Sequence, residues 1–168
     1  MSTEKKTALE RMSLALAQML RTTPIEQIFV KELCERAGVN RSTFYRHFAD
    51  PYALLAHVWC GLTQTYLDKV YRPGLSEHEA LVRLLDFTQE NRIVVLAVFR
   101  LVVLGRPLPD YADFVRVTLV DRCPAEKAIY LQAALVSMIY RWLLETEPAP
   151  ASSLAQMMID VSSSLSTS

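Results

Sequence analysis

The feature that most constrains how this chain can fold is a short corner between two predicted helices, Ala37-Gly38-Val39. Ala37 is small enough to let the two helices cross closely. Gly38 can adopt the left-handed backbone conformation that a residue with a Cβ atom resists. Val39 can point beneath the corner, where three further apolar side chains complete a small core: Leu33, Phe44 and Phe48. Two short helices joined at a steep angle by a glycine-containing turn are typical of a helix-turn-helix.

The rest of the sequence also favours helices over strands. Apolar residues recur at steps of three and four, as in Leu9, Met12 and Leu16, which places them on one face of a helix. The chain holds only four glycines and no Asn-Gly hairpin dipeptide, and no run alternates cleanly between apolar and polar residues. The sequence therefore predicts an all-α fold.

Capping residues and prolines predict where these helices begin. Asn40 and Asp50 are suitable N-cap residues, and Pro51 fits the first position of a helix. Ser76 and Glu79 have the spacing of a capping box. The expected helices cover approximately residues 4–21, 30–38, 41–48, 51–71, 76–90, 92–104, 110–120 and 124–146, and Ser152 or Ser153 is expected to cap a last helix.

The clearest linker signal is the pair Pro73-Gly74, because both residues interrupt helices. It predicts a division of the chain into two parts. We expect a helix-turn-helix head over residues 1–50, a connecting fourth helix over residues 51–72, and a second helical domain over residues 73–168.

The composition argues against several classes of protein. Eighteen basic and eighteen acidic residues give a net charge of zero, unlike a general polyanion binder. The histidines and cysteines show no metal-ligand spacing, and no C-x-x-C pair occurs, so we expect neither a metal site nor a disulfide framework. A nucleophile elbow, a phosphate loop and a dinucleotide fingerprint are all missing from the sequence. We therefore expect a protein that is not an enzyme and holds no cofactor.

Signals for secretion or membrane insertion are also missing from the sequence. The N-terminal residues are polar and lack the apolar core of a signal peptide. The most apolar stretch, residues 93–104, is interrupted by Arg100 and is too short to span a bilayer. We expect a soluble cytoplasmic protein.

The second helix of the motif carries the candidate binding residues. Once its apolar side chains are assigned to the core, the side chains that remain are hydrogen-bond donors and one hydroxyl-bearing aromatic, which suit base edges and phosphates. They are Arg41, Ser42, Thr43, Tyr45, Arg46 and His47. The alternative is a helical corner whose polar face is simply solvated.

The string from Val30 to Phe48 closely resembles the signature of the TetR family, A-G-V-s-x-x-T-x-Y-x-H-F after an I-x-V-x-x-I run. The matching residues are Ile28, Val30, Leu33, Ala37, Gly38, Val39, Thr43, Phe44, Tyr45, His47 and Phe48. The resemblance covers residues 7–70, and residues 130–158 also look like a C-terminal pattern of one subgroup. It implies a DNA-binding head followed by a helical domain for ligand binding and dimerisation.

The resemblance also implies roles for individual residues. Residues 41–43 should face the major groove, Tyr45 and His47 should contact phosphates, and Lys31 could reach the DNA backbone. One departure concerns Pro51, because the family usually has a lysine there that contacts phosphate. Pro51 offers neither an ammonium group nor an N–H, so some DNA affinity should be lost.

Aromatic residues and an arginine in the second part suggest a ligand pocket between helices. An arginine there would suit an anionic effector. The candidates are Trp59, Phe87, Phe99, Arg100, Tyr111 and Phe114. The alternative is an ordinary aromatic core with arginines whose charged ends reach solvent.

The helix expected over residues 124–146 is apolar on more than one side, so it must be buried on more than one side. We expect it to pair with the last helix in a homodimer, through Ile129, Ala133, Val136, Ser137, Tyr140, Met157 and Val161. The leading hypothesis is a homodimeric repressor that binds a palindromic double-stranded operator and responds to a small-molecule effector. The alternative is a TetR-fold co-regulator that acts through a protein partner without reading DNA.

Overall fold

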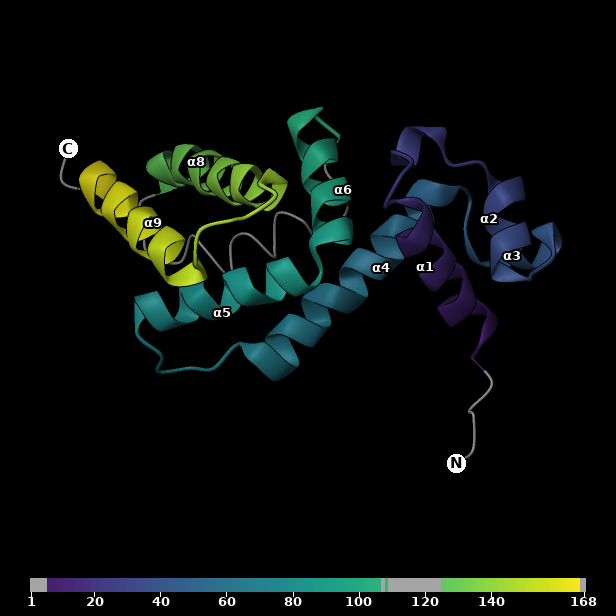
Figure 1. Ribbon diagram of the computed structural model, residues 1–168, viewed down its shortest axis with the longest axis horizontal. Coiled ribbons are helices and arrows are strands. Elements are labelled where there is room, and N and C mark those ends of the chain that lie inside the picture. Colours follow the sequence, from purple (N-terminus) through teal and green to yellow (C-terminus); the bar gives the residue numbers. More distant parts are fainter. Residues whose placement is uncertain (1–5, 107, 109–124, 167–168) are drawn as a thin grey trace. The chain divides into compact units, whose positions relative to one another are not determined.

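The computed structural model describes residues 6–106, 108 and 125–166, and within these residues it contains helices and no strand (Figure 1). The predicted all-α fold is therefore confirmed. The side chains of residues 125–132 and 165–166 are not described. The contacts divide the chain into two compact units, Met1–Gly61 and Leu62–Ser168, which we describe separately.

The first unit begins with α1 (Ala8–Met19). We expected this helix to start near residue 4, but Thr7 is its N-cap. The Thr7 Oγ1 accepts a hydrogen bond from the Glu10 N–H at 3.2 Å, and the Glu10 carboxylate accepts one from the Thr7 N–H at 2.7 Å. This capping box fixes the first residue of α1, because it satisfies N–H groups that have no partner inside the helix.

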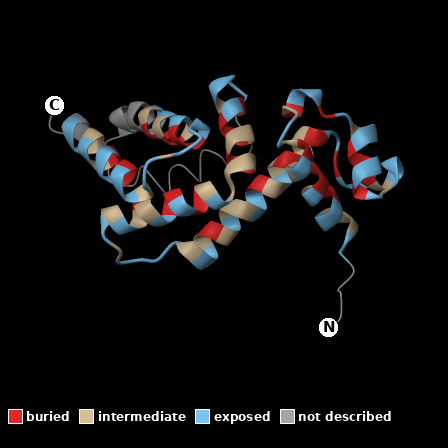
Figure 2. Cartoon of the chain, in the orientation of Figure 1, coloured by how far each residue is buried: buried red, intermediate tan, exposed pale blue. Residues whose placement is uncertain are grey.

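The helix-turn-helix follows a short 3₁₀ turn, Ile25–Gln27. It consists of α2 (Val30–Ala37) and α3 (Arg41–His47), and α2 packs against both α1 and α3. The long α4 (Pro51–Thr65) comes next, and the Asp50 carboxylate accepts a hydrogen bond from the Ala53 N–H at 2.8 Å, as expected of an N-cap. The centre of this unit is fully buried and apolar, as the red segments of Figure 2 show: Met12, Leu16, Leu33, Phe44, Leu54 and Leu55.

The second unit begins near the end of α4, where the chain changes its helical form. We expected one helix to continue to about residue 71. Instead, α4 ends at Thr65, and a π-helical turn, Tyr66–Val70, follows it. Three of the remaining helices are α5 (Glu77–Glu90), α6 (Arg92–Val103) and α8 (Ala125–Leu144), and the last is α9 (Ala151–Ser166). The helix expected over residues 110–120 lies outside the described residues.

The helices of the second unit pack as α5 on α9, α6 on α8 and α8 on α9. Arg92, at the start of α6, donates hydrogen bonds to the carbonyls of Leu143 at 2.6 Å and Glu145 at 3.3 Å. These carbonyls lie at the C-terminal end of α8, where a helix has unsatisfied acceptors and a partial negative charge. Arg92 therefore caps α8.

The start of α9 differs from our expectation. We expected Ser152 or Ser153 to cap it, but the helix already begins at Ala151. The carbonyl of Pro150 accepts hydrogen bonds from the N–H groups of Ser153 at 3.0 Å and Leu154 at 3.3 Å. Proline in the preceding position restricts the backbone, and the helix starts two or three residues earlier than a cap at Ser152 or Ser153 would give.

Candidate nucleic-acid interface

The corner of the helix-turn-helix is a left-handed turn at Gly38, whose φ is 62° and ψ is 43°. The Gly38 N–H donates to the Glu35 carbonyl at 3.3 Å, and the Val39 N–H donates to the Cys34 carbonyl at 3.0 Å. This pair of bonds is a Schellman motif, which closes α2 and satisfies its last carbonyl groups. The backbone of Gly38 thus sends the chain from α2 into α3, as the sequence predicted.

The helix α3 is held in place by two aromatic side chains. Phe44 is fully buried and Phe48, directly after the helix, is 9% exposed, and their ring centroids lie 5.8 Å apart. Asn40 occupies the N-cap position, where its carbonyl accepts hydrogen bonds from the N–H groups of Thr43 and Phe44. One face of α3 is therefore fixed in the core, and the remaining faces are available for binding.

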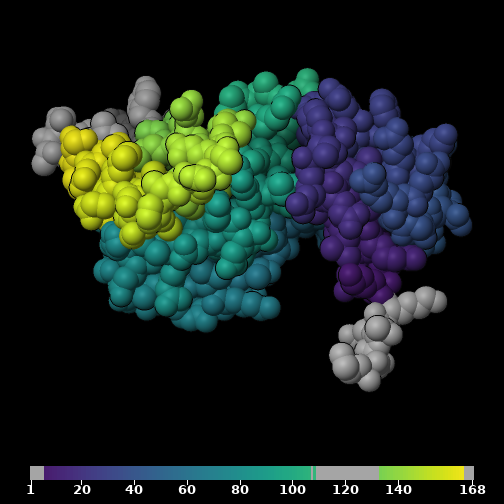
Figure 3. Space-filling model, viewed as in Figure 1, coloured from purple at the N-terminus to yellow at the C-terminus, as the bar shows by residue number. Residues whose placement is uncertain are grey.

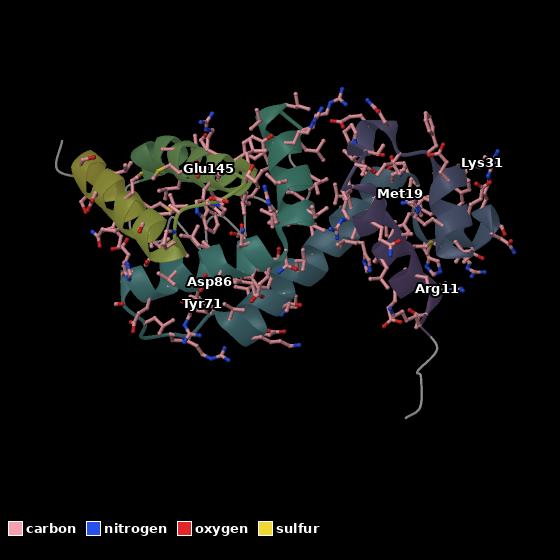
Figure 4. The ribbon with its side chains drawn as sticks, in the orientation of Figure 1. Arg11, Met19, Lys31, Tyr71, Asp86 and Glu145 are labelled. Atoms are coloured by element: carbon pink, nitrogen blue, oxygen red, sulfur yellow. The ribbon has the colours of Figure 1, made fainter. Side chains whose placement is uncertain are left out.

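The predicted binding residues lie on these two helices. Tyr45 is 58% exposed, Thr43 is half-buried, and the others are exposed: Lys31, Arg41, Ser42, Arg46 and His47. Figure 2 colours the exposed residues of α2 and α3 pale blue, and Figure 4 labels Lys31. The structure places Lys31 in the first turn of α2 and the others on α3. Because α2 and α3 pack against each other, all seven belong to one small motif.

Two further residues lie at or near the helix-turn-helix and were not among the binding residues predicted from the sequence. Arg11 of α1 reaches the corner, because its Nη1 atom lies 3.9 Å from the position that a Cβ on residue 38 would occupy. Figure 4 labels Arg11 on α1. Phe29, at the N-cap of α2, is 65% exposed. The contact of Arg11 depends on how α1 crosses α2, which no spacing rule predicts, whereas an aromatic residue in a capping position was a signal that could have been used.

The N-terminus of α4 is not open to an anion from outside the chain. The Asp50 carboxylate already occupies it, bound to the Ala53 N–H, and the Pro51 side chain is buried. A helix N-terminus attracts anions through its free N–H groups and its dipole. Here a carboxylate of the same chain takes that place, so the departure at Pro51 comes together with a negative charge.

Within the helix-turn-helix, burial favours the protonated form of the Cys34 thiol. Cys34 is buried in α2, and burial raises the pKa of its thiol, whereas the charge of Arg41 acts in the opposite direction. Cys60, on α4, is exposed. Within the described residues, no group of three or more His, Cys, Asp or Glu side chains could hold a metal ion.

The residues proposed for a ligand pocket have different environments. Trp59 on α4 is buried, and so are Phe87 on α5 and Phe99 on α6. Arg100 is exposed, and Tyr111 and Phe114 lie outside the described residues. Tyr66 packs against Phe87 with ring centroids 5.4 Å apart, and burial raises the pKa of its hydroxyl to about 12.

The residues proposed for a dimer interface are also found in several environments. Ala133, Ser137 and Met157 are exposed, Tyr140 and Val161 are half-buried, and Val136 is buried. The side chain of Ile129 lies outside the described residues.

Among the described helices, none is long and apolar enough to cross a membrane.

Two short helices, α2 and α3, joined by a left-handed glycine corner form a helix-turn-helix, a motif common in DNA-binding proteins. Residues 15–58 match the family of bacterial regulatory proteins of the tetR type. The matched residues contain the helix-turn-helix, and the helical fold of the described residues agrees with this similarity. A comparison with curated protein sequences found no match.

Solved structures share the fold over nearly the whole chain at low sequence identity. A transcriptional regulator from Rhodococcus sp. Rha1 has a TM-score of 0.62 and 19% identity, covering 92% of this chain and 95% of that one. The dihydroxyacetone kinase operon activator DhaS has a TM-score of 0.60 and 15% identity, covering 95% and 96%. The TetR family repressor AlkX from Dietzia sp. strain DQ12-45-1b has a TM-score of 0.51 and 14% identity, covering 95% of both chains.

Proposed function

We propose that this protein is a homodimeric, ligand-responsive repressor whose two heads bind a palindromic operator. The observation that carries the proposal is α3, which buries Phe44 and leaves Arg41, Tyr45 and Arg46 exposed on one short helix. Arginine donors suit guanine edges and phosphates, and the tyrosine hydroxyl suits a phosphate oxygen. Lys31, Ser42, Thr43 and His47 complete the proposed contact surface.

The operator should contain two half-sites, one for each head. Dimeric helix-turn-helix proteins read half-sites separated by about one helical turn, ~34–36 Å. We assign the head to residues 1–50, the connection to residues 51–72 and effector binding and dimerisation to residues 73–168. An effector that binds the second domain would weaken DNA binding only if it binds the DNA-free conformation more tightly.

The test is selection of DNA fragments from the source genome by the purified protein, followed by sequencing. We expect enriched fragments to share an inverted repeat with the half-site spacing given above. Fragments enriched without any common sequence would contradict the proposal. The sign of regulation is a separate measurement, because one protein of this fold is described as an activator and another as a repressor. A reporter gene under the selected operator should lose expression when the protein is present.

A second candidate function is a co-regulator that acts through a protein partner and does not read DNA. The N-terminus of α4 favours it, because the Asp50 carboxylate and Pro51 stand where a basic residue would strengthen phosphate binding. The variant Pro51→Lys separates the two functions. For a DNA reader, we expect tighter binding to most sequences and a salt dependence steeper by about one phosphate contact. An unchanged salt slope would show that the start of α4 does not approach DNA.

A further inference from the structure

Two polar side-chain atoms of the second unit are buried and have no hydrogen-bond partner among the described residues. They are the hydroxyl oxygen of Thr63, near the end of α4, and the amide oxygen Oε1 of Gln89, near the end of α5. A buried polar atom that has given up water without gaining a partner makes the fold less stable, so few such atoms occur in native proteins. A bound molecule that supplies the partner would explain why both are kept.

The two side chains lie on the same side of an aromatic contact. Tyr66 and Phe87 pack with ring centroids 5.4 Å apart, across the reversal of the chain over residues 71–76 (Figure 1). Thr63 comes about one helical turn before Tyr66, and Gln89 comes two residues after Phe87. Both steps lead away from the reversal, so the two polar atoms face one region of the second unit.

This region lies next to an irregular segment of the chain. Thr63 stands just before the π-helical turn, and α5 packs on that turn. Figure 3 shows the atoms of these segments, in teal, in close contact over one face of the second unit. Helical turns of this kind are rare and are often found at functional sites. The two unsatisfied atoms therefore lie beneath the surface, beside a segment whose form is typical of binding sites.

The interior around these atoms carries no buried charge. Within the part of the chain that the structure describes, no Asp, Glu, Lys or Arg side chain is buried. Thr88 is buried, but its hydroxyl already donates to the Leu85 carbonyl at 2.8 Å. A charged molecule brought into this interior would lose its hydration and meet no opposite charge. The surroundings therefore favour an uncharged ligand.

We infer that Thr63 and Gln89 bind an uncharged alcohol or phenol through its hydroxyl group. A hydroxyl group is both a donor and an acceptor, so it can donate to the Gln89 Oε1 and accept from the Thr63 hydroxyl. The rest of the ligand is apolar, because the side chains of Tyr66 and Phe87 beside this region are buried aromatic rings. This inference rests on the proposed ligand response and names the chemistry of the effector.

The first test compares molecules of one shape that differ in a single group. p-Cresol carries a hydroxyl group, p-toluate a carboxylate and p-xylene a methyl group. The wild-type chain should bind p-cresol at least about tenfold more tightly than either of the others, as measured by isothermal titration calorimetry. n-Hexanol and hexanoate repeat the comparison without an aromatic ring. If p-toluate bound as tightly as p-cresol, or if neither hydroxyl compound bound, the inference would be overturned.

The second test removes each polar atom and keeps a similar side-chain shape, with Thr63→Val and Gln89→Met. Each variant should bind p-cresol about tenfold more weakly. The thermal unfolding temperature of the ligand-free chain should stay the same or rise, because an apolar group replaces an unsatisfied polar one. Thr88→Val is the matched control. It removes a hydroxyl that is hydrogen-bonded, so it should lower the unfolding temperature and leave p-cresol binding unchanged.

The same variants give the results that would overturn the inference. If Thr63→Val and Gln89→Met lowered the unfolding temperature as Thr88→Val does, both polar groups would have partners in the ligand-free chain. Unchanged p-cresol binding in both variants would also overturn it. The comparison of p-cresol with p-toluate needs no variant, so it remains decisive if a variant does not fold.

A measurement of operator binding separates this inference from the proposed function. We expect p-cresol to release the operator from the wild-type chain and not from Thr63→Val or Gln89→Met. If p-cresol bound through these two residues without changing operator affinity, the binding site would stand and the proposed ligand response would fail. If a charged compound released the operator from a chain that does not bind p-cresol, the ligand response would stand and this inference would fail.

Discussion

Gly38 determines how α2 leads into α3. Its φ of 62° lies in the left-handed region, and the Schellman bonds of Glu35 and Cys34 carbonyls depend on that conformation. Space is not the reason for glycine here, since the nearest atom to an added Cβ is the Arg11 Nη1 at 3.9 Å, an ordinary contact. The requirement for glycine is therefore one of backbone conformation alone.

The variant Gly38→Ala should lower the free energy of unfolding by about 1–2 kcal/mol, the usual cost of a left-handed residue with a Cβ atom. Gly38→Asn is the control, because asparagine tolerates this conformation better than other residues with a side chain. It should lose less stability than the alanine variant. Urea unfolding followed by circular dichroism measures both. Equal losses in the two variants would indicate that a steric contact, and not φ, makes glycine necessary.

Arg41 and Tyr45 are the residues on which the proposed DNA contact most depends. Both are exposed, so Arg41→Ala and Tyr45→Phe should leave the thermal unfolding temperature unchanged. Operator binding by Arg41→Ala should weaken by about 1–3 kcal/mol, the value of a lost base contact. Tyr45→Phe removes a phosphate partner and should weaken binding to all sequences alike. Mobility shifts would measure both, with Arg83→Ala on α5 as the control; full affinity in both variants would remove α3 from the interface.

Helix α5 shows how a cap recognised in the sequence behaves in the structure. The Ser76 Oγ accepts from the Glu79 N–H at 3.3 Å, and the Glu79 carboxylate accepts from the Ser76 hydroxyl at 2.6 Å and the Ser76 N–H at 3.0 Å. The hydrogen bonds from the Ser76 hydroxyl and N–H lower the pKa of Glu79. A lowered pKa in the folded state means that the ionised carboxylate favours folding.

The variant Ser76→Ala should lower the free energy of unfolding by about 1 kcal/mol at neutral pH, as for other N-cap serines. The stabilisation by Glu79 is complete above the ordinary glutamate pKa of about 4.3 and is lost as the pH falls through the lower folded value. The difference between wild type and variant should therefore shrink on acidification. Ser152→Ala is the control, because α9 begins at Ala151 without a serine cap. Urea unfolding at several pH values tests this, and a difference independent of pH would contradict a role for the Glu79 carboxylate.

Local signals predicted the head more accurately than the second unit. The corner at Gly38, the anchor Phe44 and the cap at Asp50 all depend on contacts within a few residues, so the sequence was sufficient for them. In the second unit, the same holds for the cap at Ser76. The π-turn at Tyr66–Val70 was not predicted, because its form depends on packing against α5, where Tyr66 meets Phe87. The cap of α8 by Arg92 joins residues about fifty positions apart, and periodicity carries no information about such a pair.

In the candidate site too, residues placed by local spacing could be predicted, whereas residues placed by the packing of one helix on another could not. The polar residues of α3 could be assigned because the helical period fixes which side chains are buried with Phe44. Arg11 could not, since its place beside the corner follows from how α1 packs on α2. Among the candidate ligand residues of the second unit, Arg100 is exposed whereas Phe99 is buried, and their role in binding a ligand stays a prediction.

At the scale of the whole molecule, the proposed function requires two copies of the chain. One head offers a single short recognition helix, and the proposed operator has two half-sites, so one copy would bind only half of the contacts. One apolar surface available for association is the groove between α8 (Ala125–Leu144) and α9 (Ala151–Ser166), with its exposed Met157. Val136, which the sequence also suggested, is buried within its own chain, so a charge there would unfold the protein and not test association.

The variant Met157→Glu should therefore be the informative one. A carboxylate on the wall of an apolar groove must be desolvated when the groove is covered, and an unpaired buried charge is strongly unfavourable. We expect a folded monomer with a mass near 19.1 kDa by light scattering, where the wild type shows about twice this value at micromolar concentration. Operator binding should be lost together with the dimer, because each head alone holds only one half-site. Val103→Glu is the matched control, since Val103 is 66% exposed and lies outside the groove, so this variant should keep both the dimer and the operator. If Met157→Glu remained dimeric and bound the operator normally, the two copies would have to associate through another surface.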